Sequence, residues 1–290
     1  WLEDCDLAGY NSNKFDLPML AEELERAATY KKIPGVITVD AGEKLTVVIS
    51  IGAQGLQELM EELKPLKLDG KTFVLCMKGI EIGTGRRLSQ IAAENLDSSN
   101  HVAVWLGPGH VQEFYNGIPN CMVIDSDEPA ARNRLIEAFS GELIRFYYGN
   151  DLLGNEVGAA AKNVVGIAAG VLDGLGLSTL KGALMSRGTR EVGRLIRAMG
   201  GNELSVYGLC HLGDYEATVF SKYSHNRAFG EAFVKGEPYT ALAEGYATVR
   251  ALVVLGQVYH VDLPICQAVY NILYNGASVR GELEILFDRG

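Results

Sequence analysis

The 290-residue sequence predicts an α/β domain followed by an all-α domain. Up to about residue 150, short β-branched apolar runs alternate with amphipathic helical patterns, which is typical of α/β domains. After that point only helical periodicity continues. We therefore expect one domain over residues 1–150 and a second over residues 151–290, each long enough to enclose a core.

Five runs in the first half have the composition of buried strands in a largely parallel sheet. They lie at residues 46–50, 72–77, 102–106, 121–124 and 143–148. Two helices are expected between them. Residues 56–63 place Leu56, Leu59, Met60 and Leu63 on one face, and residues 128–139 follow good capping residues.

Four segments of the second half carry helical periodicity. They span residues 159–172, 180–200, 240–260 and 263–276. The ligands of open α/β sheets bind at the carboxyl ends of the strands. The loops that follow Met77 and Leu106 are therefore the expected binding loops of the first domain.

Composition excludes several classes of function. The formal net charge of −10 disfavours a nucleic-acid partner, although local cations can still hold an anionic substrate. The five scattered cysteines contain no C-x-x-C and suggest reduced thiols, as in the cytoplasm. No apolar run reaches the roughly 18–20 residues of a membrane span, so we expect no stable membrane insertion.

Lys162 is the only charged residue between Val157 and Leu172. On a helix, Gly158 and Gly166 lie one turn to either side of it, and no acidic residue lies three or four positions away. An unpaired buried ammonium is costly, so a remote carboxylate or a ligand is expected beside it. A general acid and base, or a lysine that only extends to solvent, both remain open.

Residues 211–231 combine an aspartate with Ser224, Asn226 and Arg227. Serine, asparagine and arginine are suitable donors to a phosphate monoester, but an ordinary polar loop has the same composition. Cys210, His211, Asp214 and His225 match no familiar zinc spacing, so we expect no metal site.

Several motifs occur in the order found in the NAD(P)-dependent glycerol-3-phosphate dehydrogenases, and the sequence resembles that family. They are IPGV (33–36), MKGIEIGTGRRLS (77–89), LGPG (106–109), AAKNVVGIAAGVLDGLG (160–176), GLCHLGD (208–214), SHNRAFGE (224–231), AEGYAT (243–248) and LPICQAVYNILYNG (263–276). The resemblance implies a Rossmann-like N-terminal domain and a helical C-terminal domain. It also implies interconversion of dihydroxyacetone phosphate and sn-glycerol 3-phosphate with NAD or NADP, supplying phospholipid synthesis.

The resemblance also implies the site residues. Lys162 would be the catalytic acid and base, with Asp214 as its remote partner and Lys78 beside them. The substrate would contact Lys78, Gly107, Gly109, Asn163, Asp214, Thr218, Ser224, His225, Asn226 and Arg227. The cofactor would contact Lys78, Val111, His225, Arg227, Leu242 and Glu244. The expected assembly is a cytoplasmic homodimer with a small phosphorylated substrate.

The sequence departs from the family pattern in three places. No G-x-G-x-x-G follows a strand, so the first strand–helix unit of the Rossmann-like domain is expected to be missing from this chain. Gly109 and His110 replace a hydroxyl residue and an aromatic residue, and His225 stands where the family has arginine. Two alternatives stay open: a dehydrogenase of another small phosphorylated or carboxylated ketone, and a catalytically silent binding or assembly module.

Overall fold

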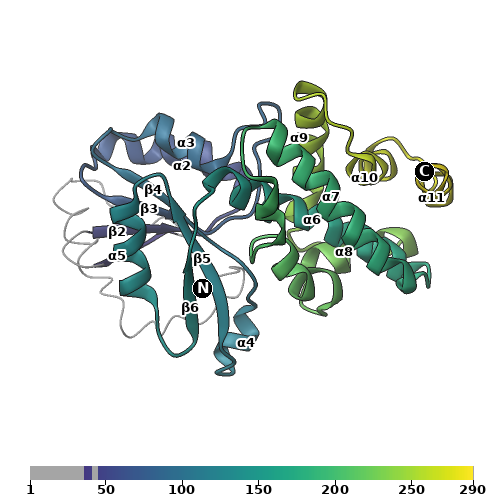
Figure 1. Ribbon diagram of the computed structural model, residues 1–290, viewed down its shortest axis with the longest axis horizontal. Coiled ribbons are helices and arrows are strands. Elements are labelled where there is room, and N and C mark those ends of the chain that lie inside the picture. The colour runs from purple at the N-terminus through teal and green to yellow at the C-terminus, as the bar shows by residue number, and fades with distance from the viewer. Residues whose placement is uncertain (1–35, 41–44, 290) are drawn as a thin grey trace. The chain divides into compact units, whose positions relative to one another are not determined.

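The computed structural model describes residues 36–40 and 45–289, which form two compact units (Figure 1). The first unit contains the described residues up to Met77 together with Leu88–Leu152. The second contains Lys78–Arg87 and the residues from Leu153 onward. The expected absence of a first strand–helix unit concerns the chain before Val36, which lies outside the described residues.

The first unit is built on a six-stranded sheet whose strands are arranged in chain order. The strands are β1 (Val36–Asp40), β2 (Leu45–Ile49), β3 (Thr72–Leu75), β4 (His101–Leu106), β5 (Asn120–Ser126) and β6 (Ile144–Tyr148). The pairs β2–β3, β3–β4 and β5–β6 are parallel, whereas β1–β2 and β4–β5 are antiparallel. The sheet is therefore mixed, with more parallel than antiparallel pairing.

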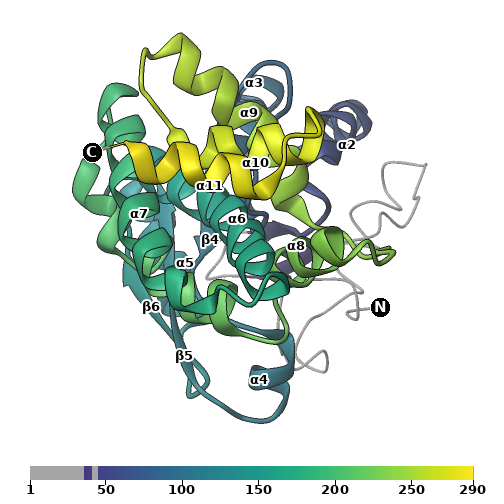
Figure 2. The same cartoon turned by 90° about the vertical axis from the view of Figure 1, so that its right-hand side faces the viewer.

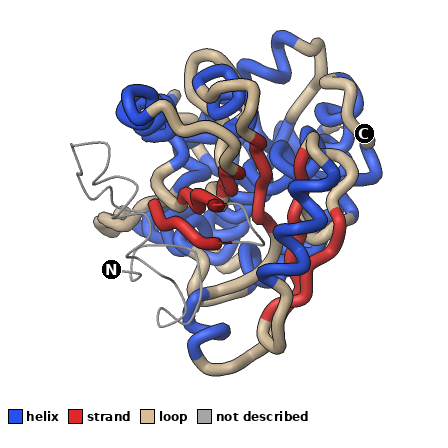
Figure 3. The backbone as a smooth tube through the Cα atoms, turned by 90° about the vertical axis from the view of Figure 1, so that its left-hand side faces the viewer, coloured by secondary structure: helices blue, strands red, loops and turns tan. Residues whose placement is uncertain are grey.

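Helices pack against this sheet (Figure 3). Strands β2 to β5 bury consecutive residues, whereas β6 buries Ile144 and Phe146 and exposes the residues between and after them. On one face, α5 (Pro129–Phe139) packs into a cluster that includes Val74, Trp105 and Ile124. Trp105 and Phe139 lie with ring centroids 5.3 Å apart. The described part of the unit contains three further helices: α2 (Leu56–Leu63), α3 (Leu88–Asn95) and α4 (Val111–Tyr115). Of these, α2 and α3 pack on each other, and α3 also contacts β4.

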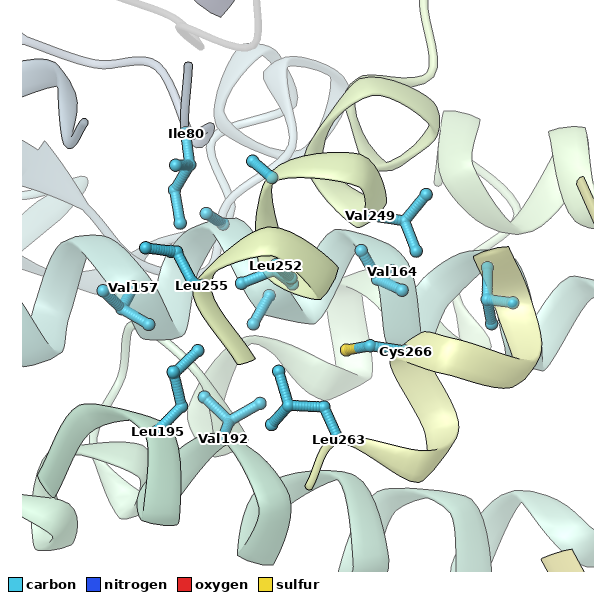
Figure 4. Close-up of a cluster of buried hydrophobic side chains, with 14 of the residues drawn as sticks. Ile80, Val157, Val164, Val192, Leu195, Val249, Leu252, Leu255, Leu263 and Cys266 are labelled. Carbon is cyan, nitrogen blue, oxygen red and sulfur yellow. The ribbon is translucent and has the colours of Figure 1, made fainter. Parts of the chain in front are cut away.

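The second unit is helical, and among the described residues no strand follows Tyr148. Its main helices are α6 (Leu152–Gly174), α7 (Lys181–Ala198), α8 (His225–Lys235), α9 (Glu244–Val258), α10 (Pro264–Tyr274) and α11 (Val279–Asp288) (Figure 2). Val157 and Val164 of α6 lie in the core with Leu252 of α9 and Leu195 of α7 (Figure 4). In the described chain α6 alone is long and apolar enough to span a membrane, and 83% of its most apolar window is buried inside the protein.

Glycines allow α6 to approach its neighbours backbone to backbone. A Cβ added at Gly170 would overlap the carbonyl oxygen of Arg227 in α8, and one at Gly230 would overlap that of Ile167. A Cβ at Gly245 of α9 would likewise lie 2.6 Å from a carbonyl oxygen of α6. Side chains at these positions would push the helices apart, so the spacing of the glycines determines how closely α6, α8 and α9 pack.

Candidate active site

Lys162 and Asn163 are buried in the middle of α6. Asp214 and Thr218 approach them from two short turns that follow one another in the chain. Asp214 ends a 3₁₀ turn (Leu212–Asp214), and Thr218 lies in a π-helical turn (Glu216–Phe220). Single π-helical turns are rare and occur frequently at functional sites.

The structure places Asp214 against Lys162, as the remote partner expected from the sequence. The ammonium nitrogen of Lys162 lies 3.0 Å from Oδ2 of Asp214 and donates to Oγ1 of Thr218 at 2.7 Å. Thr218 donates in turn to Oδ1 of Asp214 at 3.5 Å. The buried ammonium therefore has both a counter-ion and an oriented hydroxyl acceptor, as a desolvated charge requires.

Lys78 brings a second cation to the same carboxylate. It follows β3 in the chain, but its segment belongs to the helical unit, where Ile80 is fully buried. Its ammonium lies 3.0 Å from Oδ2 of Asp214, and its carbonyl oxygen accepts a hydrogen bond from Nδ2 of Asn163 at 2.9 Å. Two ammonium groups and one carboxylate give the cluster a formal charge of +1, which suits an anion or a developing oxyanion.

Side chains of the chain itself lie against the two glycines that flank Lys162. A Cβ at Gly158 would lie 3.2 Å from Cβ of His211. A Cβ at Gly166 would lie 2.8 Å from Thr218 and 3.2 Å from Cβ of Asn226. The room beside α6 is occupied by side chains of the chain itself, including one that supports Lys162 directly.

The four expected phosphate-side residues lie at the start of α8, and each already has an intramolecular partner. Ser224 caps the helix by accepting from the backbone N–H of Arg227 at 3.3 Å, and Asn226 accepts from the N–H of Gly245 at 2.8 Å. Nδ1 of His225 lies 2.8 Å from the hydroxyl of Tyr239.

A buried donor of Arg227 lacks a partner among the described residues. Its Nη1 lies 2.9 Å from Glu231 and 3.3 Å from Asp173. Its buried Nε has no hydrogen-bond partner among the described residues. None of the hydrogen bonds or ion pairs of Ser224, His225, Asn226 and Arg227 described above reaches Lys162, so the structure does not join these four residues to the lysine cluster through such bonds.

The other expected site residues, Gly107 and Gly109 for the substrate and Val111, Leu242 and Glu244 for the cofactor, are spread over both units. Gly107 and Gly109 follow β4, and Val111 begins α4. Gly107 has φ +127°, and a Cβ there would lie 3.1 Å from Cα of Met122, so the backbone itself requires glycine. In the helical unit, Leu242 is exposed and Glu244 begins α9.

The sequence analysis missed the role of His211, which is fully buried. Nδ1 lies 2.8 Å from the carbonyl oxygen of Gly158, and Nε2 lies 2.7 Å from the hydroxyl of Tyr215. Burial lowers the pKa of His211 to about 4, so the ring is neutral near pH 7. Within the described residues no three His, Cys, Asp or Glu side chains gather to hold a metal ion.

A Rossmann-like α/β unit and a helical unit with a buried lysine–carboxylate centre define the class of two-domain nicotinamide-nucleotide dehydrogenases. Two family models match the chain: the N-terminus of the NAD-dependent glycerol-3-phosphate dehydrogenases over residues 38–132, and their C-terminus over residues 151–284. The chain belongs to the NAD-dependent glycerol-3-phosphate dehydrogenase family, which confirms the resemblance.

Relatives agree with this assignment. A protein of Prosthecochloris aestuarii named glycerol-3-phosphate dehydrogenase [NAD(P)+] is 35% identical over 294 residues, covering 94% of this chain and 89% of its own. One of the same name from Desulfitobacterium hafniense is 32% identical, covering 98% and 84%. The crystal structure of glycerol-3-phosphate dehydrogenase from Coxiella burnetii matches with a TM-score of 0.76 at 28% identity, covering 84% of this chain and 76% of its own.

Proposed function

We propose that this chain interconverts dihydroxyacetone phosphate and sn-glycerol 3-phosphate with NAD(H) or NADP(H). Relatives at about one-third identity over most of the chain have the corresponding name. The observation that carries the proposal is the cluster of the buried Lys162 and Asp214 with the partly buried Lys78, which combines a proton donor with excess positive charge. That combination suits reduction of a ketone on an anionic substrate.

The described sheet has features that suit a nicotinamide nucleotide. Strands β2, β3 and β4 run parallel, so Ile49, Leu75 and Leu106 end at one edge of the sheet. Nucleotides bind outside the carboxyl ends of such strands. The expected loop after Leu106 and the glycine-bearing loop after β2 would hold the nucleotide there, whereas the expected loop after Met77 belongs to the helical unit. Val111, Leu242 and Glu244 are further proposed contacts. When bound, the nicotinamide supplies or accepts the hydride.

In our proposal, Lys162 moves the proton. During reduction its Nζ–H gives a proton to the carbonyl oxygen of the substrate, while the carbonyl carbon receives the hydride. Asp214 favours the charged form of Lys162 and holds its head in place, and Thr218 orients it further. Lys78 adds a second positive charge beside the developing alkoxide, and Asn163 anchors the backbone of Lys78.

The remaining proposed contacts recognise the phosphate and the substrate hydroxyl. Arg227 is supported as the phosphate donor by its buried Nε, which has no partner among the described residues. Ser224, His225, Asn226, Gly107 and Gly109 complete the proposed set. The product would supply phospholipid synthesis, and we propose that the enzyme acts in the cytoplasm as a homodimer.

A substrate panel tests this function. Oxidation of NADH and of NADPH by the purified protein should be rapid with dihydroxyacetone phosphate and much slower with other small phosphorylated or carboxylated ketones. Preference for one of those ketones would identify a related dehydrogenase instead. Binding of nucleotide without turnover of any of them would favour a catalytically silent protein.

A further inference from the structure

His211 and Asp214 lie at the two ends of one short turn, and both side chains contact α6. His211 contacts the carbonyl oxygen of Gly158, whereas Asp214 contacts the ammonium of Lys162. His211 and Asp214 are three residues apart in the turn, and their partners Gly158 and Lys162 are four residues apart in α6. The turn and α6 are therefore joined by two successive contacts.

The carbonyl that His211 contacts belongs to the helical turn that carries Lys162. In an α-helix the N–H of residue i+4 donates to the carbonyl of residue i, so the backbone N–H of Lys162 also points at the oxygen of Gly158. A carbonyl oxygen has two lone pairs and can accept from both donors. The imidazole is therefore tied directly to the backbone that positions the lysine.

We infer that His211 is a positioning residue whose hydrogen bond to Gly158 holds Asp214 against Lys162. The expected effect on catalysis rests on the proposed function. The hydrogen-bond geometry does not depend on it. Glycine at position 158 permits the contact, since a Cβ there would press on Cβ of His211 at 3.2 Å. The backbone N–H of Asp214 also donates to the carbonyl of His211 at 3.1 Å, so the turn transmits the position of one residue to the other.

The carbonyl of Gly158 determines which nitrogen of His211 carries the proton, and Tyr215 is the partner of the other nitrogen. A carbonyl oxygen only accepts, so Nδ1 must donate to Gly158 and Nε2 must accept from the Tyr215 hydroxyl at 2.7 Å. The hydroxyl of Thr189 donates to the hydroxyl oxygen of Tyr215 at 3.3 Å. The low pKa of His211 agrees with a neutral ring that needs no counter-ion and leaves Asp214 to the lysines.

Three variants of His211 test the inference. Asparagine can place its amide N–H near the position of Nδ1, glutamine places its amide near Nε2, and leucine offers no donor. The His211→Asn variant should retain most of the wild-type kcat, whereas His211→Gln and His211→Leu should lose at least about tenfold with little change in KM. Activity that is retained only by the variant with a donor near the position of Nδ1 would show that the hydrogen bond, and not the packing of the ring, positions Asp214.

The pH profile of kcat for ketone reduction gives a second readout. Asp214 pairs with Lys162 and also with Lys78, and the neutral ring of His211 lies beside them. If the carboxylate moves away, the protonated form of Lys162 is less favoured, and the fall in rate at high pH begins at lower pH. That shift should occur in His211→Leu and be absent in His211→Asn.

Crystal structures of the wild type and of His211→Leu provide a readout that needs no substrate. The inference predicts that the Lys162–Asp214 distance lengthens beyond about 4 Å, the limit of an ion pair, in the variant. An unchanged 3.0 Å pair, together with an unchanged pH profile, would overturn the inference. Failure of the wild type to reduce dihydroxyacetone phosphate would instead contradict the proposed function and leave the crystallographic test intact.

Discussion

The ammonium nitrogen of Lys162 lies 3.0 Å from Oδ2 of Asp214, and both side chains are almost fully buried. A buried charge is stable only with a partner, so removing either group has consequences beyond catalysis. Lys78 reduces the cost of replacing Lys162, because its ammonium contacts the same carboxylate oxygen of Asp214. Asp214 remains paired when Lys162 is replaced, whereas both lysines lose their carboxylate when Asp214 is replaced.

Replacement of Asp214 by asparagine should therefore reduce both activity and stability. We expect kcat to fall by at least about 10²-fold because Lys162 loses charge stabilisation and orientation. The free energy of unfolding should drop by about 3 kcal/mol, since the buried ammonium of Lys162 and the partly buried ammonium of Lys78 both lose this carboxylate. Urea titration and steady-state kinetics measure the two effects. A variant with wild-type kcat would show that the carboxylate plays no part in the reaction.

Arg227 should contribute mainly to binding of the phosphorylated substrate. The Arg227→Met variant removes the buried Nε donor and should raise KM about tenfold with a smaller change in kcat, as loss of a charged hydrogen bond predicts. Arg280→Met, at an exposed arginine of α11 in an i,i+4 pair, is the matched control and should leave KM unchanged. Equal KM values in both variants would remove Arg227 from the proposed site.

His211 should make the protein less stable as the pH falls from about 6.5 to about 4. Burial lowers the pKa of folded His211 to about 4 from the ordinary 6.5, so between these values the unfolded chain binds a proton that the folded chain does not. The contribution of neutral His211 to the free energy of unfolding is fully present above pH 6.5. It decreases by on the order of 3 kcal/mol as the pH falls toward 4. Urea titrations from pH 4 to 7 should show a steeper pH dependence in wild type than in His211→Asn, and parallel curves would contradict the assignment.

The contact between α6 and α8 should tolerate no side chain at Gly170. Alanine there would overlap the carbonyl oxygen of Arg227, and forcing the helices apart should cost about 1–3 kcal/mol or more. Gly182, near the start of α7, has nothing within 4 Å of an added Cβ. Gly182→Ala should be neutral or stabilising by up to about 1 kcal/mol. The melting temperatures of the two variants should therefore differ, with Gly170→Ala the lower. Equal melting temperatures would contradict the close contact between α6 and α8 at Gly170.

The strands and the amphipathic helices could be predicted because their signals are local. The predicted helix over residues 56–63 coincides with α2, and the five predicted strand runs overlap β2 to β6. The structure adds β1, α3, α4, α8 and α11, which the sequence analysis did not assign. In the case of α8, serine, asparagine and arginine also suit a polar loop, and its capping by Ser224 becomes visible only in the folded backbone.

The candidate site could be only partly predicted. The isolated charge of Lys162 indicated a need for a distant partner, but the spacing along the chain gives no hint of which residue supplies it. Thr218 is 56 residues from Lys162, and Asp214 is 136 residues from Lys78. The structural role of His211 depends on a single backbone carbonyl, which no sequence pattern marks. The resemblance to a family, rather than periodicity, suggested the partners.

The most direct test of the account is the rate of dihydroxyacetone phosphate reduction by the Lys162→Met variant. Methionine preserves the apolar length of the side chain and leaves Asp214 paired with Lys78, so the fold and nucleotide binding should persist. The account predicts that kcat falls by about 10²–10⁴-fold while the fluorescence-detected affinity for NADH or NADPH stays near that of the wild type. A variant that reduces the ketone within about threefold of the wild-type rate would contradict the central claim that Lys162 supplies the proton.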